Sequence, residues 1–288
     1  YILEDAPETH AQKAGTPTTG GVFIILSAIA ASLAALTMNQ SLTTSALITL
    51  MTLVFFMLAG LTDDFGKIKH KANKAGLRPR NKLFLQFAIS LLPALYMTLS
   101  GQTGIIIGHF TLDLGYVYPF FAILFITGIS NAVNLTDGLD GLASANTAVA
   151  MLACAILCVF TGQNDLAIIA AATTGATVAF LYYNRHPAKV FMGDTGSLAL
   201  GGLLATLAVL GKFELWIALI GIVFCCETLS VIIQVTSFKL TGKRVFKMSP
   251  IHHHFELCGW SENKIVTVFS LVTFLFSALA VTLFKILL

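Results

Sequence analysis

The chain has 288 residues, of which 56% are hydrophobic and only 11% are charged, and its formal net charge is +3. A soluble globular domain carries about 25% charged residues, so this composition excludes an ordinary water-soluble protein. It favours a chain embedded in a lipid bilayer, and we expect no nucleic-acid partner.

Nine segments have the length and apolar character of membrane-spanning helices, which need about 20 mostly apolar residues each. In chain order they are Gly21–Met38, Leu42–Leu61, Lys82–Leu99, Tyr116–Val133, Gly141–Thr161, Leu166–Asn184, Ser197–Leu210, Phe213–Phe238 and Ile265–Leu288. The seventh segment is short. The eighth is longer than a bilayer core of about 30 Å requires and carries Glu227, so we expect it to tilt, bend or extend into the cytoplasm. The connection between the third and fourth segments alternates apolar and polar residues around Ile105–Leu114, which predicts a small hairpin.

These segments predict an all-α polytopic membrane protein with a single domain over residues 1–288. The placement of Lys and Arg predicts its orientation, because cytoplasmic loops are enriched in these residues. When the loops are assigned alternately to two sides, 15 of the 17 basic residues fall on the side of the N-terminal tail. Only Lys212 and Lys285 fall on the other side. We therefore expect the tail at Tyr1 to be cytoplasmic and the C-terminus to face outside, with no cysteine placed for a disulfide framework.

The polar residues suited to chemistry gather in the cytoplasmic loops, whereas the outside loops show no catalytic pattern. The cytoplasmic stretches are KAGTPTTGG (Lys13–Gly21), LTDDFGK (Leu61–Lys67), NAVNLTDGLDG (Asn131–Gly141), NRHPAKVFMGDTGS (Asn184–Ser197) and SPIHHHFE (Ser249–Glu256). A transporter is expected to keep ionisable groups near the middle of the bilayer, and here only Glu227 is placed in that way. A polar layer at one membrane face instead suits chemistry on a lipid head group with a water-soluble co-substrate.

The carboxylates in these loops have both structural and functional interpretations. Asp63 and Asp64 end a span and either mark the membrane interface or, because adjacent carboxylates repel, bind a cation such as Mg²⁺. Asp137 and Asp140 would share a face of a helix, but the glycines beside them favour a loop. Asp194 lies between glycines that let backbone N–H groups approach an anion, and the serine three residues later can cap the next helix. That pattern is also an ordinary start of a helix.

The basic run from Lys67 to Lys82 either sets the topology and touches anionic lipids or holds a phosphate, since it directly follows the Asp pair. Three consecutive histidines, His252, His253 and His254, suggest a transition-metal site, but successive side chains point in different directions. We therefore expect them to divide their roles among a phosphate or metal, a carboxylate and the protein structure.

Five motifs taken together resemble one family. The stretches KAGTPTTGG, TDDFGK, NAVNLTDGLDGLA, FMGDTGSLALG and SPIHHHFE occur in the order and topology of the phospho-N-acetylmuramoyl-pentapeptide transferase (translocase I) family. This family belongs to the polyprenyl-phosphate N-acetylhexosamine-1-phosphate transferase superfamily. The resemblance covers nearly the whole chain and implies ten spans with an outside N-terminus. Because nine spans are visible, we expect a first helix to precede Tyr1.

The resemblance also implies a reaction. Members of the family transfer phospho-MurNAc-pentapeptide from UDP-MurNAc-pentapeptide to undecaprenyl phosphate in the presence of Mg²⁺, and they yield lipid I and UMP. It implies a multi-pass protein of the bacterial cytoplasmic (inner) membrane whose active site is cytoplasmic. We also expect a homodimer.

Finally, the resemblance assigns roles to individual residues. Asp194 would hold the Mg²⁺ ion at the diphosphate. Asp63 and Asp64 would position or deprotonate the lipid phosphate for direct attack on the β-phosphorus, and a two-step scheme with an aspartyl-phosphate is the rival. The remaining implied site residues are Lys67 and Lys71 for the lipid phosphate, His252, His253 and His254 beside the diphosphate, and Lys13, Asn134, Asp137, Asp140, Asn184, Phe191 and Ser197 for the uridine diphosphate portion.

Two alternatives remain open at this point. A sister enzyme would transfer GlcNAc-1-phosphate to a polyprenyl phosphate, and that branch shows a HIHH-like motif where this chain reads PIHHHFE. The more distant alternative is a transporter or channel, which the position of the polar residues at one face disfavours.

Overall fold

The structure is a computed structural model that describes residues 15–70 and 76–287. Its helices are α1 (Gly21–Met38), α2 (Thr44–His70), α3 (Pro79–Leu99), α4 (Tyr118–Thr136), α5 (Leu142–Phe160), α6 (Asn164–Asn184), α7 (Gly193–Gly211), α8 (Ile217–Ile220), α9 (Ile222–Thr241), α10 (Ile251–Leu257) and α11 (Glu262–Leu287). Two short 3₁₀ helices, η3 (Gly115–Val117) and η4 (Glu214–Trp216), precede α4 and α8. Within the described residues, nine helices are long and apolar enough to cross a membrane, which confirms the all-α polytopic prediction.

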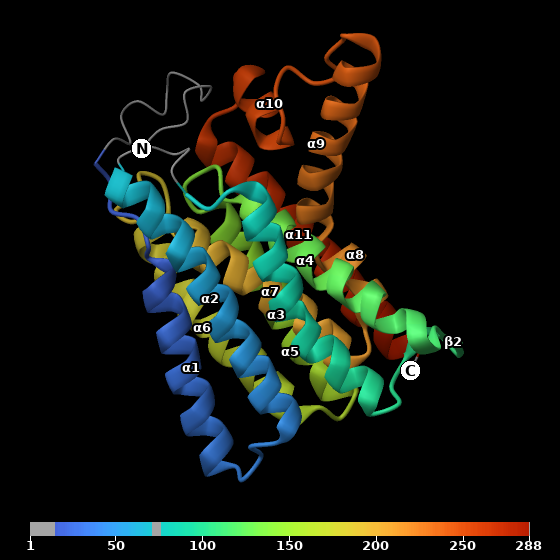
Figure 1. The fold of residues 1–288 in the computed structure, drawn as a ribbon. Coiled ribbons are helices and arrows are strands. Elements are labelled where there is room, and N and C mark those ends of the chain that lie inside the picture. Colours follow the sequence, from blue (N-terminus) through green and yellow to red (C-terminus); the bar gives the residue numbers. More distant parts are fainter. Residues whose placement is uncertain (1–14, 71–75, 288) are drawn as a thin grey trace.

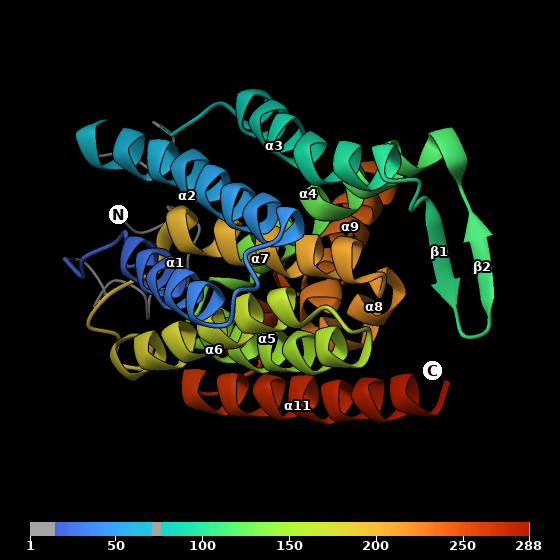
Figure 2. The same cartoon turned by 90° about the horizontal axis from the view of Figure 1, so that it is seen from below.

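Helix α7 forms the centre of the bundle. Every residue from Thr195 to Gly211 is buried, and the helix packs against α2, α4, α5, α1 and α3. Figure 2 shows α7 enclosed by these neighbours, with α11 on the far side of α5. Small residues permit this close packing, because a Cβ on Gly201 would lie 2.7 Å from the Cα of Ser130 on α4. A helix that is apolar all round is expected to be buried, and this one is.

The seventh predicted span is longer than the sequence suggested. Helix α7 begins at Gly193 rather than at Ser197, so it has 19 residues and is long enough to span. Ser197 does not cap the helix, because its hydroxyl donates to the carbonyl of Gly193 one turn earlier, 3.0 Å away. Hydrogen bonds from the start of α7 to a carboxylate on α2, described below, allow the helix to begin with the polar Gly-Asp-Thr-Gly stretch.

The eighth predicted span, which we expected to tilt, bend or extend, is interrupted in the structure. The segment contains η4 and α8, then an interruption at Gly221, and then α9. The N–H of Gly221 donates to the carbonyl of Ile217, which closes α8, and α9 starts at the next residue. Figure 1 shows α9 extending beyond the rest of the bundle toward the end where α10 lies.

The predicted hairpin is present at the other end of the molecule. Strand β1 (Gly104–Ile107) pairs antiparallel with β2 (Phe110–Asp113), and Ile105 lies opposite Leu112. Figure 2 shows this hairpin projecting from the side of the bundle. The two ends of the bundle are therefore different, with loops and α10 at one end and the hairpin at the other (Figure 1).

Candidate active site

Three carboxylates meet where the last turns of α2 approach the first turn of α7. Ligand atoms of Asp63, Asp64 and Asp194 all lie within 4.8 Å of one another. Asp63 and Asp64 are only 3% and 4% exposed, so their charges cannot be neutralised by bulk water alone. We call these three residues the acidic cluster.

Asp64 ties the two helices together. Its carboxylate accepts hydrogen bonds from the backbone N–H groups of Asp194 and Thr195, at 3.1 and 2.9 Å, and from the Thr195 hydroxyl at 2.6 Å. The first N–H groups of a helix have no partner within the helix, and a carboxylate from another helix satisfies them here. Asp64 therefore fixes the start of α7. The sequence did not reveal this contact, and for that reason it predicted a later start for the helix.

Two glycines make this close approach possible. A Cβ on Gly193, whose φ is +70°, would lie 2.6 Å from an oxygen of Asp64. A Cβ on Gly60 of α2 would collide with the backbone carbonyl of Asp194. Any side chain at either position would push α2 and α7 apart and separate the carboxylates of the acidic cluster.

Lysines compensate the negative charge of the acidic cluster. The ammonium group of Lys67 lies 2.6 Å from Asp63 Oδ2 and 3.0 Å from Asp194 Oδ2. Lys82, in the first turn of α3, lies 2.6 Å from the same oxygen of Asp194. Lys67 was expected at the site, whereas Lys82 was missed as an individual residue. The sequence feature that could have identified Lys82 is its position at the end of the basic run that follows the Asp pair.

Asn134 and Ser197, which were both predicted at the site, lie beside the acidic cluster. The amide of Asn134 donates to Asp194 Oδ1 at 2.9 Å and to the Ser197 hydroxyl at 2.8 Å. These bonds leave Asp194 held from three elements, namely α2, α3 and α4. Such a carboxylate has little freedom to rotate, which favours a role in positioning a charged ligand.

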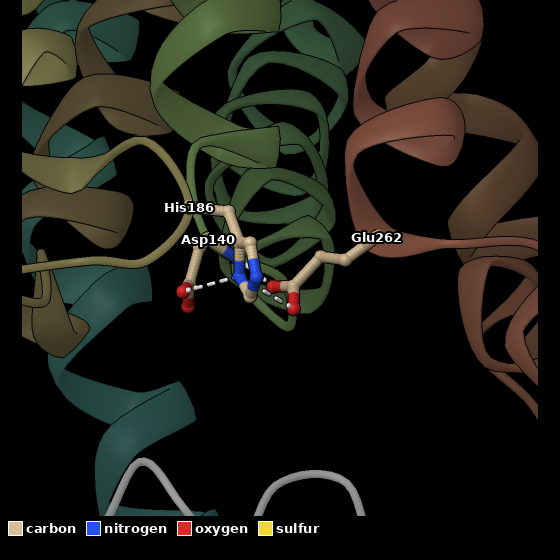
Figure 3. A group of neighbouring side chains, drawn as sticks. All are labelled: Asp140, His186 and Glu262. Atoms are coloured by element: carbon tan, nitrogen blue, oxygen red, sulfur yellow. Dashed lines mark hydrogen bonds and ion pairs between the residues drawn. The ribbon is translucent and has the colours of Figure 1, made fainter.

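A second polar group lies beside the turn between α4 and α5. Figure 3 shows the imidazole of His186 between the carboxylates of Asp140 and Glu262, with Nδ1 at 3.1 Å from Asp140 and 3.2 Å from Glu262. Asp140 Oδ2 also accepts the N–H of Ala188, and the N–H of Asp140 donates to Glu262 at 2.5 Å. We call Asp140, His186 and Glu262 the loop staple, because it joins the α4–α5 turn, the α6–α7 loop and the start of α11. Neither His186 nor Glu262 was singled out in the sequence.

Asn184 uses its side chain within the same region. Its carbonyl oxygen accepts from the N–H of Gly141 and from the Ser144 hydroxyl, at 3.2 and 2.7 Å, and its amide donates to the carbonyl of Val190.

Asp137 lies in the turn rather than in a helix, as its neighbouring glycines predicted. Burial raises the pKa of Asp137 well above its ordinary value, and the charges of Asp194, Asp64 and Asp140 raise it further. The opposing effect of Lys67 is smaller.

The three histidines have different surroundings. His252 and His253 are buried at the start of α10, and their rings lie 4.1 Å apart between centroids. Nδ1 of His253 lies 2.6 Å from Glu256, whereas His254 accepts the N–H of Lys247. No histidine belongs to the acidic cluster in the part of the chain that the structure describes.

Phe191 lies at the edge of the acidic cluster's loops. Its N–H donates to the carbonyl of Pro17 and its carbonyl accepts from Gly20, so the segment before α1 runs beside the segment before α7. The ring is half-buried. Lys13 and Lys71, which were also predicted at the site, lie outside the described residues.

The fold and site define a class: a multi-pass membrane protein with a buried acidic cluster, flanked by lysines, at one end of its helix bundle. A family model described as glycosyl transferase family 4 matches residues 45–212. A Bacillus licheniformis protein named phospho-N-acetylmuramoyl-pentapeptide-transferase is 49% identical over 271 residues, 93% of this chain and 83% of the relative.

Relatives with the same name in Geobacillus sp. (strain WCH70) and Clostridium botulinum (strain Eklund 17B) are each 47% identical. These matches cover 97% and 94% of this chain and 87% and 83% of the relatives. The chain therefore belongs to the phospho-N-acetylmuramoyl-pentapeptide-transferase family, within glycosyl transferase family 4. The resemblance that the five motifs indicated is confirmed.

Proposed function

We propose that this protein transfers phospho-MurNAc-pentapeptide from UDP-MurNAc-pentapeptide to undecaprenyl phosphate, which gives lipid I and UMP in peptidoglycan biosynthesis. The observation that carries this function is the acidic cluster with Lys67 and Lys82 at one end of the membrane-spanning bundle. Family membership supports it, because the relatives are named for this transfer. A phosphoryl transfer between a lipid phosphate and a diphosphate requires positioning and charge neutralisation more than covalent help.

The residues of the acidic cluster fit a divalent cation. All the donors are carboxylate oxygens, they are close together, and they are largely buried, which is the ligand set that Mg²⁺ prefers. Asp194, with Asp63 beside it, would hold the ion. Bound Mg²⁺ would neutralise charge on the diphosphate and favour departure of UMP.

The lysines provide the fixed positive charge of the proposed site. Lys67 and Lys82 both contact Asp194 through ammonium groups, and each can pair with a phosphate oxygen when the substrates bind. Lys67 comes from α2 and Lys82 from α3, so they approach from two directions. This arrangement suits two phosphate groups that must be brought together against their mutual repulsion.

The two adjacent aspartates differ in their availability. Both oxygens of Asp64 accept hydrogen bonds from the start of α7, so its role is to hold Asp194 in place. Asp63 accepts the N–H of Leu77 and pairs with Lys67, and it is the better candidate to receive the proton of the lipid phosphate. In this scheme an oxygen of the lipid phosphate forms a bond to the β-phosphorus while the bond from that phosphorus to the UMP oxygen breaks.

The remaining predicted residues form the proposed nucleotide region. Asp137, Phe191 and Ser197 lie on the loops and helix start around the acidic cluster, and Asp140 and Asn184 hold those loops together. The half-buried ring of Phe191 offers an aromatic face to a base. The protein would act in the bacterial inner membrane, with this face toward the cytoplasm where UDP-linked substrates are made, and as a homodimer.

One assay tests this function directly. Purified protein in detergent, with undecaprenyl phosphate and Mg²⁺, should release UMP from UDP-MurNAc-pentapeptide at a rate well above that from UDP-GlcNAc. EDTA should abolish release, and added Mg²⁺ should restore it. Faster release from UDP-GlcNAc would instead identify the sister activity, and no UMP from either donor would refute the proposal.

A further inference from the structure

Glu227 is a carboxylate buried inside the membrane-spanning part of α9. Its exposed fraction is 0%, and its Oε1 atom has no hydrogen-bond partner among the described residues. A buried ionised carboxylate is costly unless a cation or a set of donors compensates it. The acidic cluster, the loop staple and the nucleotide region make no use of this residue.

The group that faces Glu227 is the first histidine of the triplet. His252 Nδ1 lies 3.1 Å from Glu227 Oε2, and the backbone N–H of His252 points to the same oxygen at 3.5 Å. The imidazole is also fully buried, and neither of its ring nitrogens has a partner that meets hydrogen-bond geometry. Two buried polar side chains from α9 and α10 therefore depend on each other.

The other edge of the imidazole lies against the turn between α4 and α5. A Cβ on Gly138 would collide with His252 Nε2 and would lie 2.8 Å from Cε1. The ring thus occupies the space that a side chain at position 138 would need. Gly138 follows Asp137, whose carboxylate interacts electrostatically with Asp194 and Asp64 of the acidic cluster.

We propose that Glu227 is a positioning residue, whose carboxylate faces the Nδ1 edge of His252 at 3.1 Å and so directs Nε2 at the Asp137–Gly138 turn beside the transfer site. A carboxylate on one ring nitrogen of a histidine determines which nitrogen carries the proton and how the ring is oriented. Because the ring can shift neither toward Glu227 nor into the turn, its position and that of the turn are coupled. This role rests on the proposed transfer for its kinetic consequence, but the geometry of the pair can be measured without it.

The first test replaces Glu227 with residues of similar size. Glu227→Leu removes every acceptor, and Glu227→Gln keeps one neutral acceptor. For histidines that bind a metal, loss of the carboxylate partner costs about 10- to 100-fold in activity, and we take this as the scale for His252. We expect kcat of Glu227→Leu to fall at least tenfold with KM for both substrates within twofold, and Glu227→Gln to lie between Glu227→Leu and wild type. The melting temperature of Glu227→Leu should fall, because the buried His252 imidazole loses its partner, whereas Glu227→Gln keeps an acceptor and should stay close to wild type. Turnover is therefore measured well below the melting temperatures of all variants. Full activity at that temperature, or a loss of activity explained by a loss of folded protein, would overturn the positioning role.

The second test acts from the opposite side of the ring. Gly138→Ala should displace His252 and lower kcat, whereas Gly128→Ala on the preceding helix α4 has open space and should be tolerated. Equal activity of these two variants would also contradict the proposal.

A readout that does not depend on turnover separates this inference from the proposed function. In protein labelled with ¹⁵N-histidine, the His252 resonances are identified by their loss in His252→Ala. We expect a protonated Nδ1 in wild type and an altered protonation pattern in Glu227→Leu. Unchanged His252 resonances would refute the pairing even in an active enzyme. If the resonances change as expected but wild-type protein releases no UMP, the transfer fails and the positioning of His252 stands.

Discussion

Asp194 is the residue on which the contacts of the acidic cluster converge. Lys67 and Lys82 neutralise one of its oxygens, and Asn134 donates to the other. Its backbone N–H is held by Asp64. The Asp194 side chain thus contacts residues of α2, α3 and α4. Because these contacts are polar and lie at the proposed site, replacement of Asp194 should affect catalysis more than folding.

Asp194→Asn is therefore expected to lower turnover by about 10²-fold or more, the scale observed when one electrostatic stabiliser is lost. The variant should also need more Mg²⁺ for half-maximal activity. The measurement is UMP release over a Mg²⁺ titration. Asp165→Asn is the matched control, because Asp165 is a buried aspartate on α6 whose carboxylate accepts a hydrogen bond from Thr43 rather than from the acidic cluster. Near-normal turnover with an unchanged Mg²⁺ response would remove Asp194 from the site.

The raised pKa of Asp137 predicts how the stability of the protein depends on pH. Burial and neighbouring carboxylates raise its folded-state pKa above the unfolded value of about 3.9. The folded state therefore binds the proton more tightly, so this residue's contribution to stability is fully present below the unfolded pKa and is lost as pH rises through the folded pKa.

Asp137→Asn removes this penalty, so it should raise the melting temperature relative to wild type more at pH 7.5 than at pH 5. Thermal unfolding in detergent with EDTA measures the difference without bound metal. A gain of the same size at both pH values, or a loss at pH 7.5, would show that ionised Asp137 is well accommodated.

At the scale of elements, short polar contacts hold together loops that are distant in the sequence. The loop staple joins the α4–α5 turn, the α6–α7 loop and the start of α11 (Figure 3). Asn184 adds a further link between the end of α6 and the start of α5. Because these links lie beside the proposed nucleotide region, their loss should loosen substrate binding before it affects the chemical step.

Glu262→Ala should therefore raise KM for the UDP-linked substrate severalfold while kcat changes less than twofold. Glu262→Gln keeps an acceptor for the N–H of Asp140 and should show a smaller effect. Asn263→Ala, at the exposed neighbouring position, should behave like wild type. Steady-state kinetics of the three variants decides the matter, and a drop in kcat alone for Glu262→Ala would assign the loop staple to catalysis rather than binding.

At the scale of the whole molecule, the polar sites lie at one end of the bundle and the β1–β2 hairpin lies toward the other (Figure 1). The distribution of Lys and Arg predicts that the former end faces the cytoplasm. Lys212 and Lys285 are the exceptions on the hairpin side, and Lys212 is compensated by Glu214 at 3.0 Å. An isolated outside lysine with its own partner does not change the orientation rule.

Cysteine labelling in intact cells tests this orientation. In a background with Cys258→Ser, Asn164→Cys at the first residue of α6 should react with a membrane-impermeant maleimide added outside. Lys243→Cys, after α9, should react only after the membrane is permeabilised. The reverse pattern would place the acidic cluster outside the cell, away from its proposed nucleotide substrate.

The sequence alone was sufficient for the nine spans, the hairpin and the family, and it indicated that the eighth segment would tilt, bend or extend. These features depend on local hydropathy, glycine placement and short motifs, all of which are continuous in the chain. The sequence also indicated Asp63, Asp64 and Asp194 as separate candidates, and tertiary packing brought them within one group.

Only the tertiary structure decided the contacts between distant side chains. The start of α7 depends on Asp64, which accepts the N–H of Asp194 from 130 residues away. The pairing of Glu227 with His252 and the loop staple around His186 likewise join segments with no common motif. Hydropathy and residue spacing predict which segments span the bilayer, because they depend on neighbouring residues in the chain. The partner of a buried charge is determined instead by how the helices pack.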